Sequence, residues 1–435
     1  MDTSRSNATD DLHAVQRLLL GVLFAAAGWL HSGTAAAQPA PPSIEVVHFW
    51  ESGGERAALD VVQHTFESQG GVWKDRMTKG NDASRKIVLD RIVAGYPPAA
   101  MQWHAGSDLR DIVEMGAVHD INDVAMPDGW AKTVPKLVMD RITYQGKVYL
   151  APIGIHAENW FWSNSRVLAD AGLKVPSSWA EFLKMAPVLE KRGIVPLAIG
   201  GGDWEAEILF NAILVSTVGK DAFRRLLDTN DLSVLRSPQA VEAFRILGQV
   251  SRHVGTSYRK HSWSDATAEV IAGRAATQLM GDWAKGEFLK AGMTPGKQFD
   301  CHLAPGNADL YQLVIDAFAF PVVNNPAKHV WQSKLARTMV DPSVQVRFSQ
   351  LKGSIPVRND VDVSKLDKCA RLGMQVVGKP ENQALPPSMR LQFNVRAAML
   401  ALVGQFFHEG NISPEQAAER LAQVFSQRNA NMAAR

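Results

Sequence analysis

Strand-like and helix-like segments alternate along most of this chain, and this alternation constrains its fold more than any other feature. Ile44 to Phe49 is rich in β-branched residues and predicts a strand, and Glu55 to Gln69 follows as a helix. Ser84 to Ala94 carries apolar residues at helical spacing, and Ala99 to His104 predicts the next strand. This alternation is typical of an α/β fold.

Turn and capping signals mark further elements. Arg141 to Leu150 predicts a hairpin that turns at Gln145-Gly146. Ser178 and Glu181 have the spacing of a capping box, which predicts a helix that stops at Gly193. The alternation continues to a helical C-terminus, and no internal repeat is found.

The first 37 residues have the pattern of a secretory signal peptide. Basic residues are followed by an apolar stretch, Leu18 to Leu30, and by the small residues Ala35 to Ala37. The apolar stretch is short for a bilayer core of roughly 30 Å, which argues against a retained membrane helix. We therefore expect cleavage after Ala37 and a periplasmic location. The acidic residues before Arg17 are atypical, and a later translation start is the alternative.

Composition narrows the class of protein. The chain has 46 Lys and Arg against 44 Asp and Glu, without a basic stripe, which argues against nucleic acid as a partner. Its two cysteines, Cys301 and Cys369, suit an oxidising compartment, but the sequence does not decide whether they pair. No CxxC motif is present, so no zinc or redox site is expected.

Tryptophan is abundant, with twelve Trp against five Tyr. Several lie at predicted strand ends or loops, and each has two interpretations. A Trp is usually buried in the core. A Trp that lines a cleft also offers a flat face for a sugar ring and an indole N–H for a hydrogen bond.

Five segments together resemble family 1 of the bacterial extracellular solute-binding proteins, and within it the glucose/mannose-binding branch. They follow one another in order over the whole mature chain: Val46–Glu55; Ala94–Ala99 with Met101–Gly106; Tyr144–Lys147 with Ala151–His156 and Asn159–Asn164; Met280–Phe288; and Lys352–Arg358.

The resemblance implies two α/β lobes with a ligand cleft between them and strand crossings that act as a hinge. It implies an N-terminal lobe made of 38–152 and the return segment 316–352. The C-terminal lobe would consist of 153–315 and 353–435. Ligands of open α/β sheets lie beyond the carboxyl ends of the strands, where several of the candidate residues fall.

The resemblance also implies a sugar site and the role of each residue in it. Trp50 and Trp283 would cover the ring, Glu55 and Asp316 would accept hydrogen bonds, and His104 and Lys352 would donate them. Ionised groups suit sugar hydroxyls because charge-assisted hydrogen bonds are strong. Further candidates are Phe49, Trp204, His156 and Arg390.

Some of these residues also have a structural interpretation. Lys352 before Gly353 fits a solvated turn, and Glu55 fits an acid that favours a helix N-terminus. Asp316 is different, because a carboxylate inside an apolar strand needs a partner or a ligand. His156 and Trp204 are interpreted mainly as structural.

The sequence also departs from the branch. Phe49 stands where the branch often has a first Trp, and Arg390-Leu391 stands where it typically has a small residue and a ligand-contacting His. An arginine binds carboxylates, sulfates or phosphates bidentately. An acidic or otherwise modified sugar is therefore one hypothesis, and a solvent-facing Arg390 is the alternative.

The function expected from the resemblance is that of a periplasmic receptor that captures a glucose-like monosaccharide and delivers it to the permease subunits of an ABC importer. We expect a monomer without a cofactor or metal. An enzyme is disfavoured, because no HExxH, GxSxG or Walker A motif is present. A receptor for an oligosaccharide is a further alternative. A polyamine receptor is disfavoured, because its site needs several acids, whereas the candidates here mix acid, base and Trp.

Overall fold

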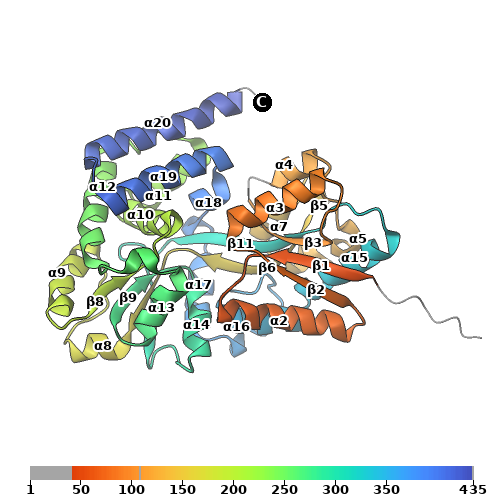
Figure 1. Ribbon diagram of the computed structural model, residues 1–435, viewed down its shortest axis with the longest axis horizontal. Coiled ribbons are helices and arrows are strands. Elements are labelled where there is room, and N and C mark those ends of the chain that lie inside the picture. Colours follow the sequence, from red (N-terminus) through yellow and green to blue (C-terminus); the bar gives the residue numbers. More distant parts are fainter. Residues whose placement is uncertain (1–41, 107–108, 434–435) are drawn as a thin grey trace, which may run out of the picture. The chain divides into compact units, whose positions relative to one another are not determined.

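The computed structural model describes the backbone of residues 42–106 and 109–433, and side chains up to residue 427. The expected signal peptide lies outside this range. Helices pack around two main β-sheets (Figure 1), which confirms the predicted α/β class. Among the residues described, no helix combines the length and apolar character needed to cross a membrane.

The larger sheet has six strands, in the order β12-β11-β3-β1-β2, with β6 paired to β11. Within this sheet β1 pairs in parallel with β2 and with β3, whereas β11 runs antiparallel to both β3 and β6. The strands are β1 (Ser43–His48), β2 (Val72–Met77), β3 (Ala100–His104), β6 (Leu150–Ala157), β11 (Tyr311–Ala319) and β12 (Gln383–Ala384).

Helices cover this sheet on both faces. On one side α2 packs against α15 and α16, which also contact β6, and α3 packs against β1. The helices of this part are α2 (Gly53–Ser68), α3 (Asn81–Val93), α4 (Leu109–Glu114), α5 (Asn122–Ala125), α6 (Trp130–Thr133), α7 (Lys136–Ile142), α15 (Pro326–Val340) and α16 (Pro342–Lys352).

The smaller sheet has four strands, in the order β10-β7-β9-β8. They are β7 (Trp160–Asn164), β8 (Val195–Ala198), β9 (Ala275–Leu279) and β10 (Phe299–Leu303). Helices α9 and α13 contact this sheet, and α10, α12, α19 and α20 pack on one another beside it. The helices are α8 (Ser165–Asp170), α9 (Trp179–Glu190), α10 (Asp203–Val218), α11 (Lys220–Thr229), α12 (Pro238–Val250), α13 (Trp263–Ile271), α14 (Ala284–Lys290), α17 (Lys368–Val377), α18 (Pro387–Arg390), α19 (Phe393–Glu409) and α20 (Pro414–Ala433).

Two strands connect the parts of the chain that build the two sheets. Strand β6 leads directly into β7 of the smaller sheet, and β11 returns from β10 to the larger sheet. The two connecting strands are paired with each other from Leu313–Ala157 to Ala319–Leu150. The polypeptide therefore passes between the two α/β parts at adjacent positions.

The predicted hairpin and capping box form in outline but differ in detail. The hairpin lies between β4 (Thr143–Tyr144) and β5 (Lys147–Val148), and its turn residues Gln145 and Gly146 both have positive φ, as in a tight hairpin turn. Its arms are shorter than expected, because residues 141 and 142 belong to α7. The Ser178 side chain caps α9, but the Glu181 carboxylate accepts hydrogen bonds from Ser177 instead of closing the capping box.

The two cysteines, whose pairing the sequence left open, are joined in the structure. Cys301 on β10 and Cys369 on α17 form a disulfide with a Cα–Cα distance of 5.9 Å. Both residues are buried. The bond joins the edge strand of the smaller sheet to a helix that lies 68 residues further along the chain.

Candidate ligand-binding site

A cavity of about 740 Å³ is lined by residues from both α/β parts of the chain. The six residues predicted as ligand-binding all line it, together with two of the four further candidates. They are Trp50, Glu55, His104, Trp283, Asp316 and Lys352, with Phe49 and Trp204. The structure therefore gathers most of the predicted site, although whether these residues touch a ligand stays a prediction.

Asp316 lies at the centre of the larger sheet, and its neighbours follow from the strand register. It is opposite His104 on β3 and Gly154 on β6. The Asp316 Oδ1 atom is 3.2 Å from His104 Nε2, and Oδ2 is 3.2 Å from His156 Nε2. Burial disfavours the charged carboxylate, but the two histidines outweigh burial and hold the pKa of Asp316 well below its usual range.

His156 lies behind the cavity wall and does not line the cavity. Its Nδ1 pairs with Asp282, so the imidazole bridges two buried carboxylates. Burial lowers the pKa of His156, but the attraction of Asp282 is among the effects that raise it overall. Its contacts are those of a residue that orients Asp316, in line with the structural interpretation.

Lys352 and Glu55 form a buried ion pair in the cavity wall, with Nζ 3.1 Å from Oε1. Lys352 ends α16 and is 2% exposed, which excludes the solvated-turn interpretation. Glu55 also completes a capping box with Ser52 at the start of α2. One Glu55 oxygen therefore caps the helix, as the structural interpretation expected, and the other holds the lysine in the cavity wall.

The tryptophans differ in how much surface they offer. Trp50 is 2% exposed and packs against Phe318 and Phe348, so it is mainly a core residue with an edge on the cavity. Trp283 is only half-buried and lies 6.5 Å from Trp204, ring centre to ring centre. The Lys352 ammonium lies 5.7 Å from the Trp283 ring and 5.5 Å from the Trp50 ring.

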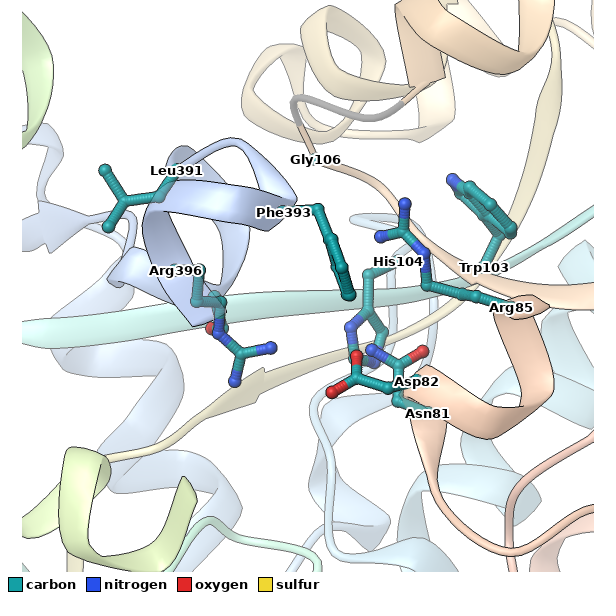
Figure 2. Close-up of a pocket in the computed structure, with 10 residues that line it drawn as sticks. Asn81, Asp82, Arg85, Trp103, His104, Gly106, Leu391, Phe393 and Arg396 are labelled. Atoms are coloured by element: carbon teal, nitrogen blue, oxygen red, sulfur yellow. The ribbon is translucent and has the colours of Figure 1, made fainter. Parts of the chain in front are cut away.

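The residues that depart from the branch lie in three different places. Phe49 is on the cavity wall, where its ring meets the edge of His104. Arg390 does not line either of the cavities found near it in the described chain. Its guanidinium instead donates to the Leu227 carbonyl oxygen at 3.2 Å and pairs with Asp228. Leu391 is buried beside a small side pocket, with its side chain pointing away from the pocket in Figure 2.

This side pocket has a volume of about 20 Å³, enough for roughly one water molecule or a small substituent. It shares five lining residues with the main cavity: Asn81, Asp82, His104, Ser388 and Arg396. Figure 2 shows Arg396 approaching it from α19 and Asp82 from the start of α3. The side pocket therefore extends the cavity between the two α/β parts.

Several cavity-lining residues were missed from the sequence, among them Glu158, Glu205, Ser388 and Arg396. Burial raises the pKa of Glu205 to about 8, and its Oε2 is enclosed without a hydrogen-bond partner in the described chain. Glu158 follows β6 directly, and the carboxyl end of a strand is a signal that points to it. Ser388 lies two residues before Arg390, in the segment where the branch has its ligand-contacting His, whereas nothing in the local pattern of Arg396 points to the cavity.

Comparison with known proteins agrees with this architecture. Residues 64–368 match the family described as bacterial extracellular solute-binding protein. A relative from Rhizobium meliloti, named as a probable sugar-binding periplasmic protein, is 35% identical over 78% of this chain and 82% of its own.

Solved structures share the fold. A chitin oligosaccharide binding protein matches with a TM-score of 0.76 at 20% identity, over 90% of this chain and all of its own. The bacterial solute receptor AcbH, described as preferring β-D-galactopyranose, matches with a TM-score of 0.75 at 17% identity, over 90% of this chain and 99% of its own. The predicted two-lobed binding-protein architecture and the resemblance are confirmed at this level. The chain therefore belongs to the bacterial extracellular solute-binding proteins.

Proposed function

We propose that this chain is an exported receptor that binds a sugar in the 740 Å³ cavity and delivers it to the permease subunits of an ABC importer. The observation that carries the proposal is the convergence of Asp316, His104 and the Lys352–Glu55 pair with the exposed face of Trp283. Such a mixture of hydrogen-bonding groups and an aromatic face suits the hydroxyls and C–H faces of a sugar. The name of the Rhizobium relative supports the same class of ligand.

The charges of this group favour a neutral sugar. The Lys352 ammonium is neutralised by Glu55, and Asp316 is flanked by two histidines. The arginine that suggested an acidic sugar, Arg390, is engaged with Leu227 and Asp228. We therefore place a neutral, glucose-like monosaccharide first. A disaccharide is the second candidate. The cavity volume of about 740 Å³ lies in the upper half of the range of roughly 300–1,000 Å³ that small-molecule sites occupy.

Binding in this proposal is coupled to closure of two lobes, 38–152 with 316–352 and 153–315 with 353–435, about the paired strands β6 and β11. A ligand that contacts both lobes stabilises the closed form only through contacts made in that form. The permease would then recognise the closed receptor. The proposal assigns no catalytic step to the cavity, and recovery of unchanged sugar after prolonged incubation checks this.

Calorimetric titration of the ligand-free protein tests the proposal. The sugars are glucose, mannose, galactose, xylose, maltose and glucuronate. We expect saturable binding of at least one neutral sugar and little response to glucuronate. A ligand at 100 times its Kd adds about 2.7 kcal/mol to the stability, which a thermal shift also detects. Tight binding of glucuronate alone would contradict the neutral-sugar proposal, and no binding of any sugar would contradict the receptor proposal.

Substitution of Trp283 tests the site itself. Trp283→Ala removes the half-exposed aromatic face, and we expect at least tenfold weaker binding of the best sugar, equivalent to about 1.4 kcal/mol. Trp331→Ala is the matched control, because Trp331 is also half-buried but packs against Phe66 and Lys334 away from the cavity. Equal losses of affinity in the two variants would contradict the assignment.

A further inference from the structure

Glu158 is a cavity-lining carboxyl group that the proposed sugar site has not used. It directly follows β6, and its backbone N–H donates to the Gln312 carbonyl oxygen at 3.0 Å, which ties it to β11. Its side chain reaches the main cavity but is almost enclosed, with only 6% of the residue exposed. The residue is thus fixed at the point where the chain passes between the two α/β parts.

The two oxygens of this carboxyl group differ. Oε1 accepts a hydrogen bond from the Ser388 hydroxyl at 2.5 Å, and Ser388, on α18, also lines the cavity. Oε2 makes no hydrogen bond within the described part of the chain. It is the oxygen left for a ligand in the cavity.

The charged groups packed around Glu158 leave it without an ion pair of its own. Arg396 on α19 is the nearby cation, but its Nη2 is bound to Glu207 of α10 at 3.1 Å. Asp82 and His104 share the adjoining cavity wall. Burial, and then repulsion from Glu207, raise the pKa of Glu158 to about 8, against the opposing effects of Ser388 and Arg396. The carboxyl group is therefore mostly neutral at pH 7.

A neutral carboxyl group has one O–H donor. Because Oε1 already accepts from Ser388, the proton belongs on Oε2. We propose that Glu158 is a further ligand-binding residue, whose Oε2–H donates a hydrogen bond to an acceptor oxygen of the bound sugar, such as a hydroxyl or ring oxygen. This proposal rests on the proposed sugar-binding function. It adds a donor to a site whose other carboxylates, Glu55 and Asp316, only accept.

The consequence is a pH dependence of sugar affinity. A ligand that requires the protonated form binds with full affinity below the pKa of the free protein and loses affinity as the pH rises through it. With a pKa of about 8, the wild-type affinity for the best neutral sugar should be nearly constant from pH 6 to 7 and about tenfold weaker at pH 9.

Calorimetric titration of that sugar at pH 6, 7, 8 and 9 tests the proposal with two variants. Glu158→Gln keeps an N–H donor that cannot ionise, so the decline above pH 8 should disappear. Glu158→Ala removes the donor, so its affinity at pH 7 should fall about three- to tenfold and be equally flat with pH. A thermal melt at each pH verifies folding, and if the alanine variant does not fold, the glutamine variant carries the test.

Glu45→Gln is the matched control, because Glu45 pairs with Arg91 and does not line the cavity. It should retain the wild-type decline at pH 9. Glu205→Gln tests the second buried cavity carboxyl group, whose pKa is also raised to about 8. A parallel decline in wild type and Glu158→Gln, or a decline abolished only by Glu205→Gln, would overturn the role of Glu158. If the wild type binds none of the sugars at any pH, the proposed function itself fails. That result differs from binding without the expected pH profile.

Discussion

At the residue scale, the site depends on buried charges that neutralise one another. Asp316 stays ionised in an apolar strand because His104 and His156 flank its two oxygens. Without partners, such a buried carboxylate would destabilise the fold. Removing one partner of a buried ion pair typically lowers the free energy of unfolding by several kcal/mol. The network therefore fixes the carboxylate in one orientation before any ligand arrives.

Asp316→Asn tests this network through pH. The pKa of Asp316 is held well below its usual value, so its stabilising contribution is present above the unfolded pKa, about 3.9, and is lost as the pH falls toward the lower folded pKa. The wild-type melting temperature should therefore fall more between pH 5 and pH 3 than that of the variant. Sugar affinity at pH 7 should drop at least tenfold, because a charged hydrogen-bond acceptor is lost. Identical acid profiles in both proteins would contradict the role of this pair.

At the scale of the elements, the site depends on how closely the end of α16 approaches the segment before α14. Gly353 caps the C-terminus of α16 with φ +99°, a conformation that favours glycine. A Cβ at this position would lie 2.1 Å from the Asp282 carbonyl oxygen, far inside contact distance. The glycine thus lets Lys352 lie beside the segment that carries Asp282 and Trp283.

Gly353→Ala should destabilise the fold by more than about 2 kcal/mol, because backbone strain of about 1–2 kcal/mol adds to a clash with the main chain. Gly410→Ala is the control, since Gly410 ends α19 with φ +61° but has open space around it. Gly410→Ala should lower the free energy of unfolding only by the backbone strain of about 1–2 kcal/mol. Chemical denaturation measures the free energy of unfolding of both variants. Equal losses of stability would show that the close approach at Gly353 does not affect stability.

At the scale of the whole molecule, the disulfide between β10 and α17 closes a long loop through the C-terminal half of the described chain. A cross-link over a 68-residue separation restricts the unfolded chain and stabilises the fold by roughly 2–5 kcal/mol. Replacing both cysteines by alanine should therefore lower the free energy of unfolding, measured by chemical denaturation, by roughly 2–5 kcal/mol. Because neither cysteine lines the cavity, sugar affinity measured well below the melting temperature should stay within about twofold. A large loss of affinity in a folded variant would contradict the structural role.

Much of this protein follows from the sequence by itself. The α/β class follows from periodicity, because a strand and a helix bury residues at different spacings. Five of the six predicted site residues lie in the short contiguous segments that carry the resemblance, and all six line one cavity. Asp316 was implied by the resemblance and was also supported by a physical argument, since a carboxylate in an apolar strand needs a partner.

Only the tertiary structure decided which distant residues meet at the cavity wall. Glu158 and Ser388 are 230 positions apart, and their hydrogen bond depends on the packing of α18 against the end of β6. The four-residue helix α18 carries both Ser388, which faces the cavity, and Arg390, which is turned toward α11. The direction of each side chain follows from its position on the helix and from how that helix packs. No local pattern records that packing, and so the sequence pointed to the arginine while the structure brought the serine and its glutamate together.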